Sequence, residues 1–406
     1  MTDSNERFQL LPTKPHPLLI AVWGFLAALN LSAGAVIATW PERQADLETM
    51  TRWGRDWLVL GLNVYGPVED DPVDYPPHAI VALSPLALVP DGWRIPVWAG
   101  FNLLLAIVAP YLALRAVHPT LTRMGAALPV LMLLCWGGFR ALLQFSLLAL
   151  VFGLLAMVLA DRRPRLSGWC LGMALMKPQM SAPIFLWALF TRRFQIAGWS
   201  IAVVVLGFTL VCARAGVAPV TVVRTYVQTL TEFYTGEAIM IGLAQLRPLF
   251  ALAVRSPVLI DFFSGVAALS LLVLVCVFGV RERRSNPAVL YSAPGLAGIW
   301  SLLTFYHLTY GFILLLPLAA LLLLDDSSTT FSLRRRIFWL MQIALMFDVP
   351  GLWWRFGSLT GASATVSQLT IHVDRLVMLG LFAAVATLAR RTSSRALHKM
   401  EVLRTL

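Results

Sequence analysis

Long apolar stretches without Asp, Glu, Lys or Arg recur along the chain and are its dominant pattern. Each is long enough to cross a hydrocarbon core of ~30 Å, which takes roughly 20 apolar residues. They lack the polar face that a surface helix of a soluble protein shows with a helical period. The pattern therefore predicts an all-α, polytopic integral membrane protein. The clearest of these stretches are Pro17–Thr39, Ile95–Leu114, Ala141–Ala160, Phe194–Ala213 and Phe262–Val280.

Composition supports the same class. Of the 406 residues, 58% are hydrophobic and 13% are charged, and the charged share is roughly half of that in a soluble domain. Pro17–Thr39 is longer than the core of a signal peptide, so we expect a retained first helix. The four cysteines lie far apart inside apolar stretches, which argues against disulfides and against a zinc cluster.

The basic residues, which give a net charge of +11, are spread in short arginine clusters between apolar stretches. This distribution follows the positive-inside rule and does not resemble a nucleic-acid-binding patch. Placing every cluster in the cytoplasm predicts about 12 transmembrane helices with both termini cytoplasmic, in a bacterial inner membrane. The clusters are Arg162–Arg165, Arg192–Arg193, Arg281–Arg284, Arg334–Arg336 and Arg390–Arg395.

This topology places three turns on the outer side of the membrane. Leu166–Thr191 begins and ends at cytoplasmic arginines, so it forms two short helices that turn at Lys177-Pro178-Gln179. A second turn holds Arg140, with Gln144 just beyond it, and a third holds His307. We treat 1–406 as one membrane-embedded domain, with 1–214 as its catalytic module and 215–406 as a variable helical module.

The first outer loop, Trp40–Pro77, carries eight acidic residues and a predicted amphipathic helix at Asp46–Leu60. Its apolar face would lie on the membrane with the tryptophans at the headgroup level. His78–Val89 is apolar but short and interrupted by Pro85, so we expect a half-buried helix beside the membrane.

Several polar groups thus gather near one leaflet. Ionisable groups at membrane depth cost ~2.5–3.5 kcal/mol or more unless they are paired or line a wet cavity, which indicates a shared polar cavity. A sugar donor held by a lipid phosphate needs cations for its developing negative charge, and a carboxylate that takes the proton of the attacking hydroxyl. The chain has no Gly-rich loop between a strand and a helix for a nucleotide-bound sugar.

These residues resemble glycosyltransferase family 87, multispan enzymes of the GT-C fold that include polyprenol-phosphate-mannose-dependent mannosyltransferases. The resemblance follows the same order over most of the chain. Its most specific part is Lys177-Pro178-Gln179 between two short apolar arms. The other matching segments are Asp46-Leu47, Val64-Tyr65, Tyr75-Pro76-Pro77, Leu83-Ser84-Pro85-Leu86, Gly168, Met173-Ala174-Leu175-Met176, Arg192-Arg193 and Phe305-Tyr306-His307.

The resemblance implies an inverting transfer of a hexose, with mannose the first candidate, from a polyprenyl-phosphate-sugar donor to a glycolipid or glycan acceptor at the outer leaflet. It implies that Asp46 is the general base and that His307 lies beside the reacting groups. It also implies no metal and no cofactor. The residues that would bind the phosphate or line the pocket are Lys177, Arg140, Tyr75, Gln144 and Gln179.

Other interpretations remain open. Glu48 and Asp74 are rival candidates for the base, and Lys177 would instead be a structural anchor if it extended to the interface. His307 would equally suit a helix end, and Arg140 a pairing with a loop carboxylate. The chain departs from the family at Leu143-Gln144-Phe145-Ser146, where a Gly-Gln-x-Asn-like turn is usual. A secondary transporter or a lipid-linked-sugar flippase is the alternative function, although the sequence shows no related halves.

Overall fold

The computed structural model describes residues 15–66, 73–118, 121–235, 246–251, 253–285, 292–305, 309–324, 331–347 and 377–386. Every regular element in these ranges is helical, as the apolar pattern predicts. His307, which the sequence singles out as a candidate site residue, lies outside the described residues.

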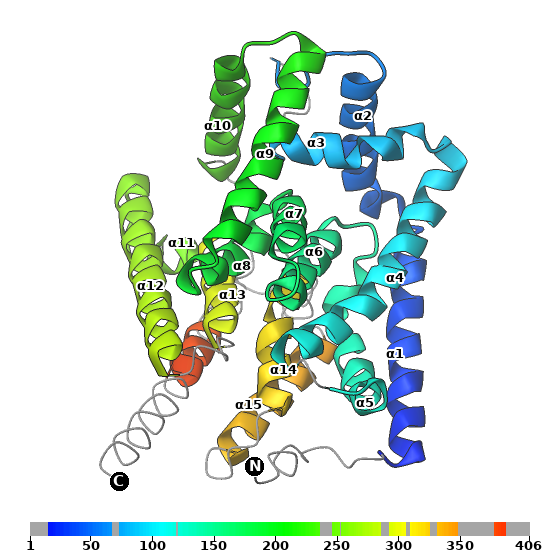
Figure 1. The fold of residues 1–406 in the computed structure, drawn as a ribbon, viewed down its shortest axis with the longest axis vertical. Helices are drawn as coiled ribbons and strands as arrows, with labels where there is room; N and C mark the ends of the chain where they lie inside the picture. Colours follow the sequence, from blue (N-terminus) through cyan, green and yellow to red (C-terminus); the bar gives the residue numbers. More distant parts are fainter. Residues whose placement is uncertain are drawn as a thin grey trace.

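The N-terminal half, up to α9, forms one flank and the centre of the bundle (Figure 1). Pro residues at the first turn begin many of these helices, where the missing N–H leaves no hydrogen bond unsatisfied. The elements are α1 (Pro17–Ile37), η2 (Pro41–Arg43), α2 (Ala45–Leu58), α3 (Pro77–Leu83), η3 (Ser84–Leu88), α4 (Asp91–Val117), α5 (Arg123–Leu134), η4 (Gly137–Arg140), α6 (Ser146–Leu159), α7 (Pro164–Ala174), α8 (Pro178–Phe190) and α9 (Phe194–Ala215).

The C-terminal half supplies the opposite flank, where α12 stands on the far side of the bundle from α1 (Figure 1). Its central helices pack against α8, and the Ser301 hydroxyl on α13 donates a hydrogen bond to the Gln179 carbonyl. The elements are α10 (Pro219–Thr235), α11 (Arg247–Ala251), α12 (Pro257–Ser285), α13 (Ser292–Thr304), η6 (Thr309–Leu315), α14 (Leu316–Leu324) and α15 (Phe331–Met346), followed by a helix over Val377–Ala386.

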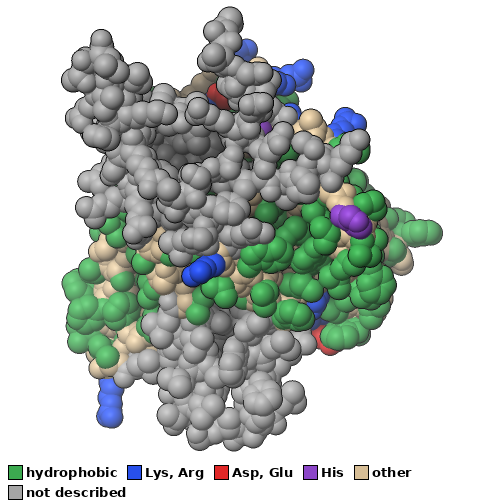
Figure 2. All heavy atoms as spheres, turned by 90° about the horizontal axis from the view of Figure 1, so that it is seen from below, with side chains coloured by type: hydrophobic (Ala, Val, Ile, Leu, Met, Phe, Trp, Pro, Cys, Tyr) green, Lys and Arg blue, Asp and Glu red, His purple; other side chains and the backbone are tan. Residues whose placement is uncertain are grey.

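Within the described ranges, four helices are long and apolar enough to cross a membrane. They are Pro17–Ile37, Asp91–Val117, Phe194–Ala215 and Pro257–Val280. Further apolar helices are shorter, so the count of about 12 spans stays a prediction. Large hydrophobic side chains are exposed along the long helices, for example Phe25 at 65% and Phe262 at 61%. Hydrophobic side chains also dominate the described surface seen from below (Figure 2), as expected of a surface that contacts lipid.

The amphipathic helix of the first outer loop forms as α2, but its apolar face has a different partner from the one predicted. Trp53 and Trp57 are 6% and 5% exposed, and α2 packs against α3, η3 and α9. Gly54 allows the close approach, since a Cβ there would lie 3.0 Å from the Ser84 Cα. The prediction that these tryptophans sit at the lipid headgroups is therefore wrong: they are covered by protein.

The short helices α7 and α8 turn back between residues 174 and 178, as the arginine clusters predict. Helix α7 packs side by side with α9 through two glycines. Gly168 lies against Ile196 and Trp199, and Gly172 lies one turn further against Ser200 and Val203. The residue numbers of the contacting positions increase together along both helices, so α7 and α9 run parallel. Their N-termini are level because the contacts lie equally far from the start of each helix. This packing fixes the turn after α7, where Lys177 is located.

We expect Gly172→Ala to destabilise the protein. A Cβ at residue 172 would lie 2.5 Å from the Val203 Cβ and 2.9 Å from the Ser200 carbonyl oxygen, so α7 and α9 would have to separate. Overpacking of this kind costs about 1–3 kcal/mol.

Gly198→Ala is the matched control on α9. Nothing lies within 4 Å of its added Cβ, and the higher helix propensity of alanine stabilises the helix by up to about 1 kcal/mol. Thermal unfolding in detergent measures both changes. Equal midpoints for the two variants would contradict the packing argument.

Candidate functional site

Lys177 lies in the turn between α7 and α8 and is buried, with 6% of its surface exposed. Its Nζ lies 5.8 Å from the centroid of the Tyr75 ring, within the range of a cation–π interaction. The three-residue turn holds the lysine backbone between two packed helices. The ammonium group is therefore positioned by the fold, and the lysine does not extend to an interface as a structural anchor.

Tyr75 is itself held from several sides. The Tyr65 hydroxyl donates a 2.7 Å hydrogen bond to the Tyr75 carbonyl oxygen. The Tyr75 ring packs edge-on against Phe145, with centroids 6.1 Å apart, and lies 6.4 Å from the Trp53 ring. Pro76 and Pro77 follow at once and begin α3. The Tyr-Pro-Pro segment thus places an aromatic ring under the lysine.

Asp46 lies in the first turn of α2 and is exposed. A carboxylate is favoured there because the N-terminal end of a helix carries partial positive charge. The side-chain amide of Gln144, in the turn before α6, donates a hydrogen bond to the Asp46 carboxylate. Two residues that are 98 positions apart in the sequence therefore meet in the fold.

Asp74, next to Tyr75, belongs to the same cluster of charges. Burial raises the pKa of the Asp74 carboxyl, Lys177 opposes the increase, and the Asp46 carboxylate adds to it. Burial lowers the pKa of Lys177 to about 8, against the opposing effects of Asp46 and Asp74. Each of these groups acts on the others electrostatically, so all three share one region. Asp46 is the exposed carboxylate, and Asp74 is half-buried.

Arg140 is held against α1. Its Nε donates a 2.6 Å hydrogen bond to the Asn30 Oδ1 on α1, and its backbone lies against Gly34. The Asn30 amide in turn donates to the carbonyl oxygens of Leu134 and Trp136, at 2.8 Å each. Arg140 therefore pairs with a side-chain amide on α1, and not with a loop carboxylate as the alternative interpretation predicted. Its predicted role in phosphate binding stays a prediction.

The structure therefore brings together Asp46, Lys177, Tyr75 and Gln144 from four separate segments. Gln179 directly follows the lysine turn, and its backbone carbonyl accepts from Ser301, which ties the site to α13. His307 falls outside the described residues, as noted above. Sequence reasoning named Asp74 only as a rival base, and it did not give Tyr65 a role. The signal for Asp74 was its position directly before Tyr75.

The arrangement combines an open carboxylate with a buried ammonium group. Asp46 is exposed and acts as a hydrogen-bond acceptor, which suits a group that takes a proton from an incoming hydroxyl. Lys177 supplies a positive charge that is largely shielded from water, where electrostatic stabilisation is strong. Among the described residues, no three His, Cys, Asp or Glu side chains converge as metal ligands. Metal independence stays a prediction.

The model of glycosyltransferase family 87 matches residues 74–305. This range contains Asp74, Tyr75, Arg140, Gln144, Lys177 and Gln179 and excludes Asp46 and His307. The searches of curated proteins and of solved structures gave no match.

Proposed function

The chain belongs to glycosyltransferase family 87, whose model covers more than half of its 406 residues, and we propose that it transfers a sugar from a polyprenyl-phosphate donor. The sugar is a hexose, with mannose the first candidate, and the acceptor is a glycolipid or glycan. The observation that carries the proposal is the buried Lys177 ammonium group beside the exposed Asp46 carboxylate. A lipid-phosphate donor needs the first group, and an attacking hydroxyl needs the second.

In the proposed reaction, the acceptor hydroxyl oxygen attacks the anomeric carbon of the donor sugar. Asp46 accepts the hydroxyl proton as the new carbon–oxygen bond forms. The bond between the anomeric carbon and the phosphate oxygen breaks, and its electron pair leaves with the polyprenyl phosphate. Lys177 stabilises the negative charge that develops on that phosphate. Attack opposite the leaving group inverts the anomeric configuration.

The other residues of the site have supporting roles in this proposal. Gln144 orients the Asp46 carboxylate through its side-chain amide, and the Tyr75 ring positions the Lys177 ammonium group through the cation–π interaction. Gln179 lines the pocket, Arg140 contributes to phosphate binding from the side of α1, and His307 lies beside the reacting groups. No metal and no cofactor takes part.

We also propose that the site opens on the outer face of the bacterial inner membrane. The supporting feature is that the arginine clusters lie at the opposite ends of α7 and α8 from Lys177. Under the positive-inside rule those ends are cytoplasmic, and the predicted count of about 12 spans then puts both termini in the cytoplasm.

The direct test is transfer by the purified protein in lipid vesicles. A short-chain polyprenyl-phosphate-mannose with radioactive sugar is supplied together with an envelope-lipid extract, and the labelled product is separated from the donor. We expect transfer to depend on both the donor and the extract. Matched reactions with glucose and galactose donors identify the preferred sugar. The absence of both transfer and donor binding with every lipid-linked sugar would reject the proposed donor class.

The pH dependence of kcat/KM reports on Lys177 in the donor-free enzyme. The ammonium group is charged below its pKa of about 8 and becomes neutral above it, so kcat/KM should fall as the pH rises through about 8. Lys177→Arg keeps a positive charge to much higher pH, so the alkaline fall should disappear from the accessible range even if the variant is slower. An unchanged alkaline fall in Lys177→Arg would assign the titration to another group.

A further inference from the structure

A second concentration of charge lies at the ends of α7 and α8 that are furthest from Lys177. The turn from α6 to α7, the first turn of α7 and the turn from α8 to α9 together carry four exposed arginines. Within the described part of the chain, the ion pairs are Arg94–Asp91, Arg193–Asp161 and Arg247–Asp261, so none neutralises these four. We call this surface the arginine patch, and its members are Arg162, Arg163, Arg165 and Arg192.

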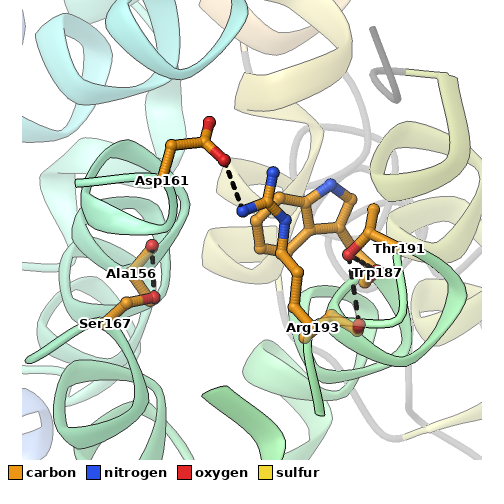
Figure 3. A network of polar contacts seen from close by, with 7 residues as sticks. Ala156, Asp161, Ser167, Trp187, Thr191 and Arg193 are labelled. Atoms are coloured by element: carbon orange, nitrogen blue, oxygen red, sulfur yellow. Dashed lines mark hydrogen bonds and ion pairs between the residues drawn. The ribbon is translucent and has the colours of Figure 1, made fainter. Parts of the chain in front are cut away.

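The two turns of the arginine patch are clamped together (Figure 3). Arg193 forms a 2.6 Å ion pair with Asp161, and its guanidinium lies 5.3 Å from the Trp187 ring centroid. The Ser167 hydroxyl donates to the Ala156 carbonyl at 2.7 Å and ties α6 to α7. Asp161, the acidic residue of these turns, is therefore paired with Arg193, which is not a member of the patch. The clamp keeps the four exposed arginines on a fixed surface.

The backbone adds positive potential to the same surface. Because α7 and α9 are parallel and level, their N-termini lie side by side, each preceded by an arginine that makes no side-chain cap. The first turns of both helices contain no acidic residue. The amide groups of an uncapped first turn and the helix dipole both favour an anion. The two helix ends therefore add to the attraction that the arginines exert on an anion.

Exposed apolar side chains border the arginine patch and point to an amphipathic ligand. Leu166 is 43% exposed, Trp169 is 42% exposed and Phe194 is 63% exposed, all within the first turns of α7 and α9 or just beyond. Trp169 stacks on Trp199, with ring centroids 6.4 Å apart. Tryptophan is typical of the boundary between headgroups and acyl chains. A soluble anion would not contact these apolar side chains. A phospholipid would contact the arginines with its headgroup and the apolar side chains with its acyl chains.

We propose that the arginine patch binds the headgroup of an anionic phospholipid, in the leaflet opposite the glycosyltransferase site. The phosphate lies between the first turns of α7 and α9, and the acyl chains lie along Trp169 and Phe194. A headgroup with two phosphodiesters suits this surface best, because it can place one phosphate at each of the two neighbouring helix ends. Binding there stabilises the α7–α9 pair that holds the lysine turn at its other end.

Native mass spectrometry of the full chain, purified in detergent, tests the proposal with diphosphatidylglycerol and phosphatidylcholine as competing lipids. The variant carries Arg162→Gln, Arg165→Gln and Arg192→Gln and leaves the Asp161–Arg193 clamp intact. Each arginine near an anionic headgroup strengthens binding roughly fivefold, so we expect the affinity for diphosphatidylglycerol to fall on the order of a hundredfold. The control carries Arg43→Gln in η2 and Arg55→Gln in α2, two exposed arginines far from the patch in the sequence, and should bind as the wild type does. Thermal unfolding in phosphatidylcholine alone verifies that the triple variant is folded.

Three results would overturn the proposal. The first is a wild type that retains no more diphosphatidylglycerol than phosphatidylcholine. The second is a folded triple variant that retains as much diphosphatidylglycerol as the wild type. The third is displacement of the lipid by an equal concentration of glycerol 1-phosphate, which would show that the patch binds a soluble phosphate and does not select a membrane lipid.

Discussion

Asp46→Asn should reduce sugar transfer by about 10²- to 10⁴-fold, the usual contribution of a general base. The replacement has the same shape, and its amide oxygen still accepts the hydrogen bond from Gln144. Folding and donor binding should therefore change little, while the ability to take a proton is lost. Single-turnover transfer in vesicles measures the rate, and equilibrium binding of a radioactive donor separates chemistry from binding.

Glu48→Gln is the matched control for this prediction. Glu48 lies in the same first turn of α2 and is also exposed, so its loss makes an equal change in local charge. Transfer should stay close to the wild-type rate. If Glu48→Gln is inactive and Asp46→Asn is active, the base is Glu48. If both are active, Asp74→Asn becomes the decisive variant, since Asp74 is the remaining carboxylate of the site.

Lys177→Met should weaken donor binding by roughly 10- to 150-fold, because a hydrogen bond to a charged group contributes about 1.5–3 kcal/mol. The same variant should be less stable than the wild type. Asp74 is half-buried and loses the cation that favours its charged form, and a charge that is partly removed from water and left without a partner is destabilising. Donor binding and thermal unfolding are measured on the same preparation.

The double variant Lys177→Met with Asp74→Asn separates the two effects. Asp74→Asn removes the half-buried charge that has lost its partner, so the double variant should recover much of the lost stability. It should not recover donor affinity, since the cation that contacts phosphate is still missing. Recovery of donor binding in the double variant would mean that Lys177 only neutralises Asp74, and the phosphate role would be withdrawn.

The lysine turn could be predicted from sequence because its evidence is local. Arginine clusters on both sides of Leu166–Thr191 require an even number of crossings, and a Lys-Pro-Gln segment in the middle breaks the helix. The structure ends α7 at Ala174 and begins α8 at Pro178. Family membership was also predicted from local motifs, and the match over residues 74–305 confirms it.

Contacts between distant segments could not be predicted in the same way. The apolar face of α2 was visible as a helical period, but a period does not reveal whether lipid or protein covers the face, and α3 and η3 cover it. The Asn30 amide that binds Arg140 lies 110 positions away in the sequence. The pairing of Gln144 with Asp46 and the position of Asp74 beside Lys177 likewise depend on how separate helices pack.

The half-length hairpin of α7 and α8 also has a consequence for how the chain enters the membrane. The two helices have 11 and 13 residues, so each is well short of the roughly 20 apolar residues that insert independently. Neither helix is expected to leave the insertion machinery by itself. The full-length α9, which follows directly and packs along α7, provides the surface that they lack. The lysine turn is therefore expected to reach its final place only after α9 has been synthesised, and a chain that stops before α9 should be degraded rather than assembled.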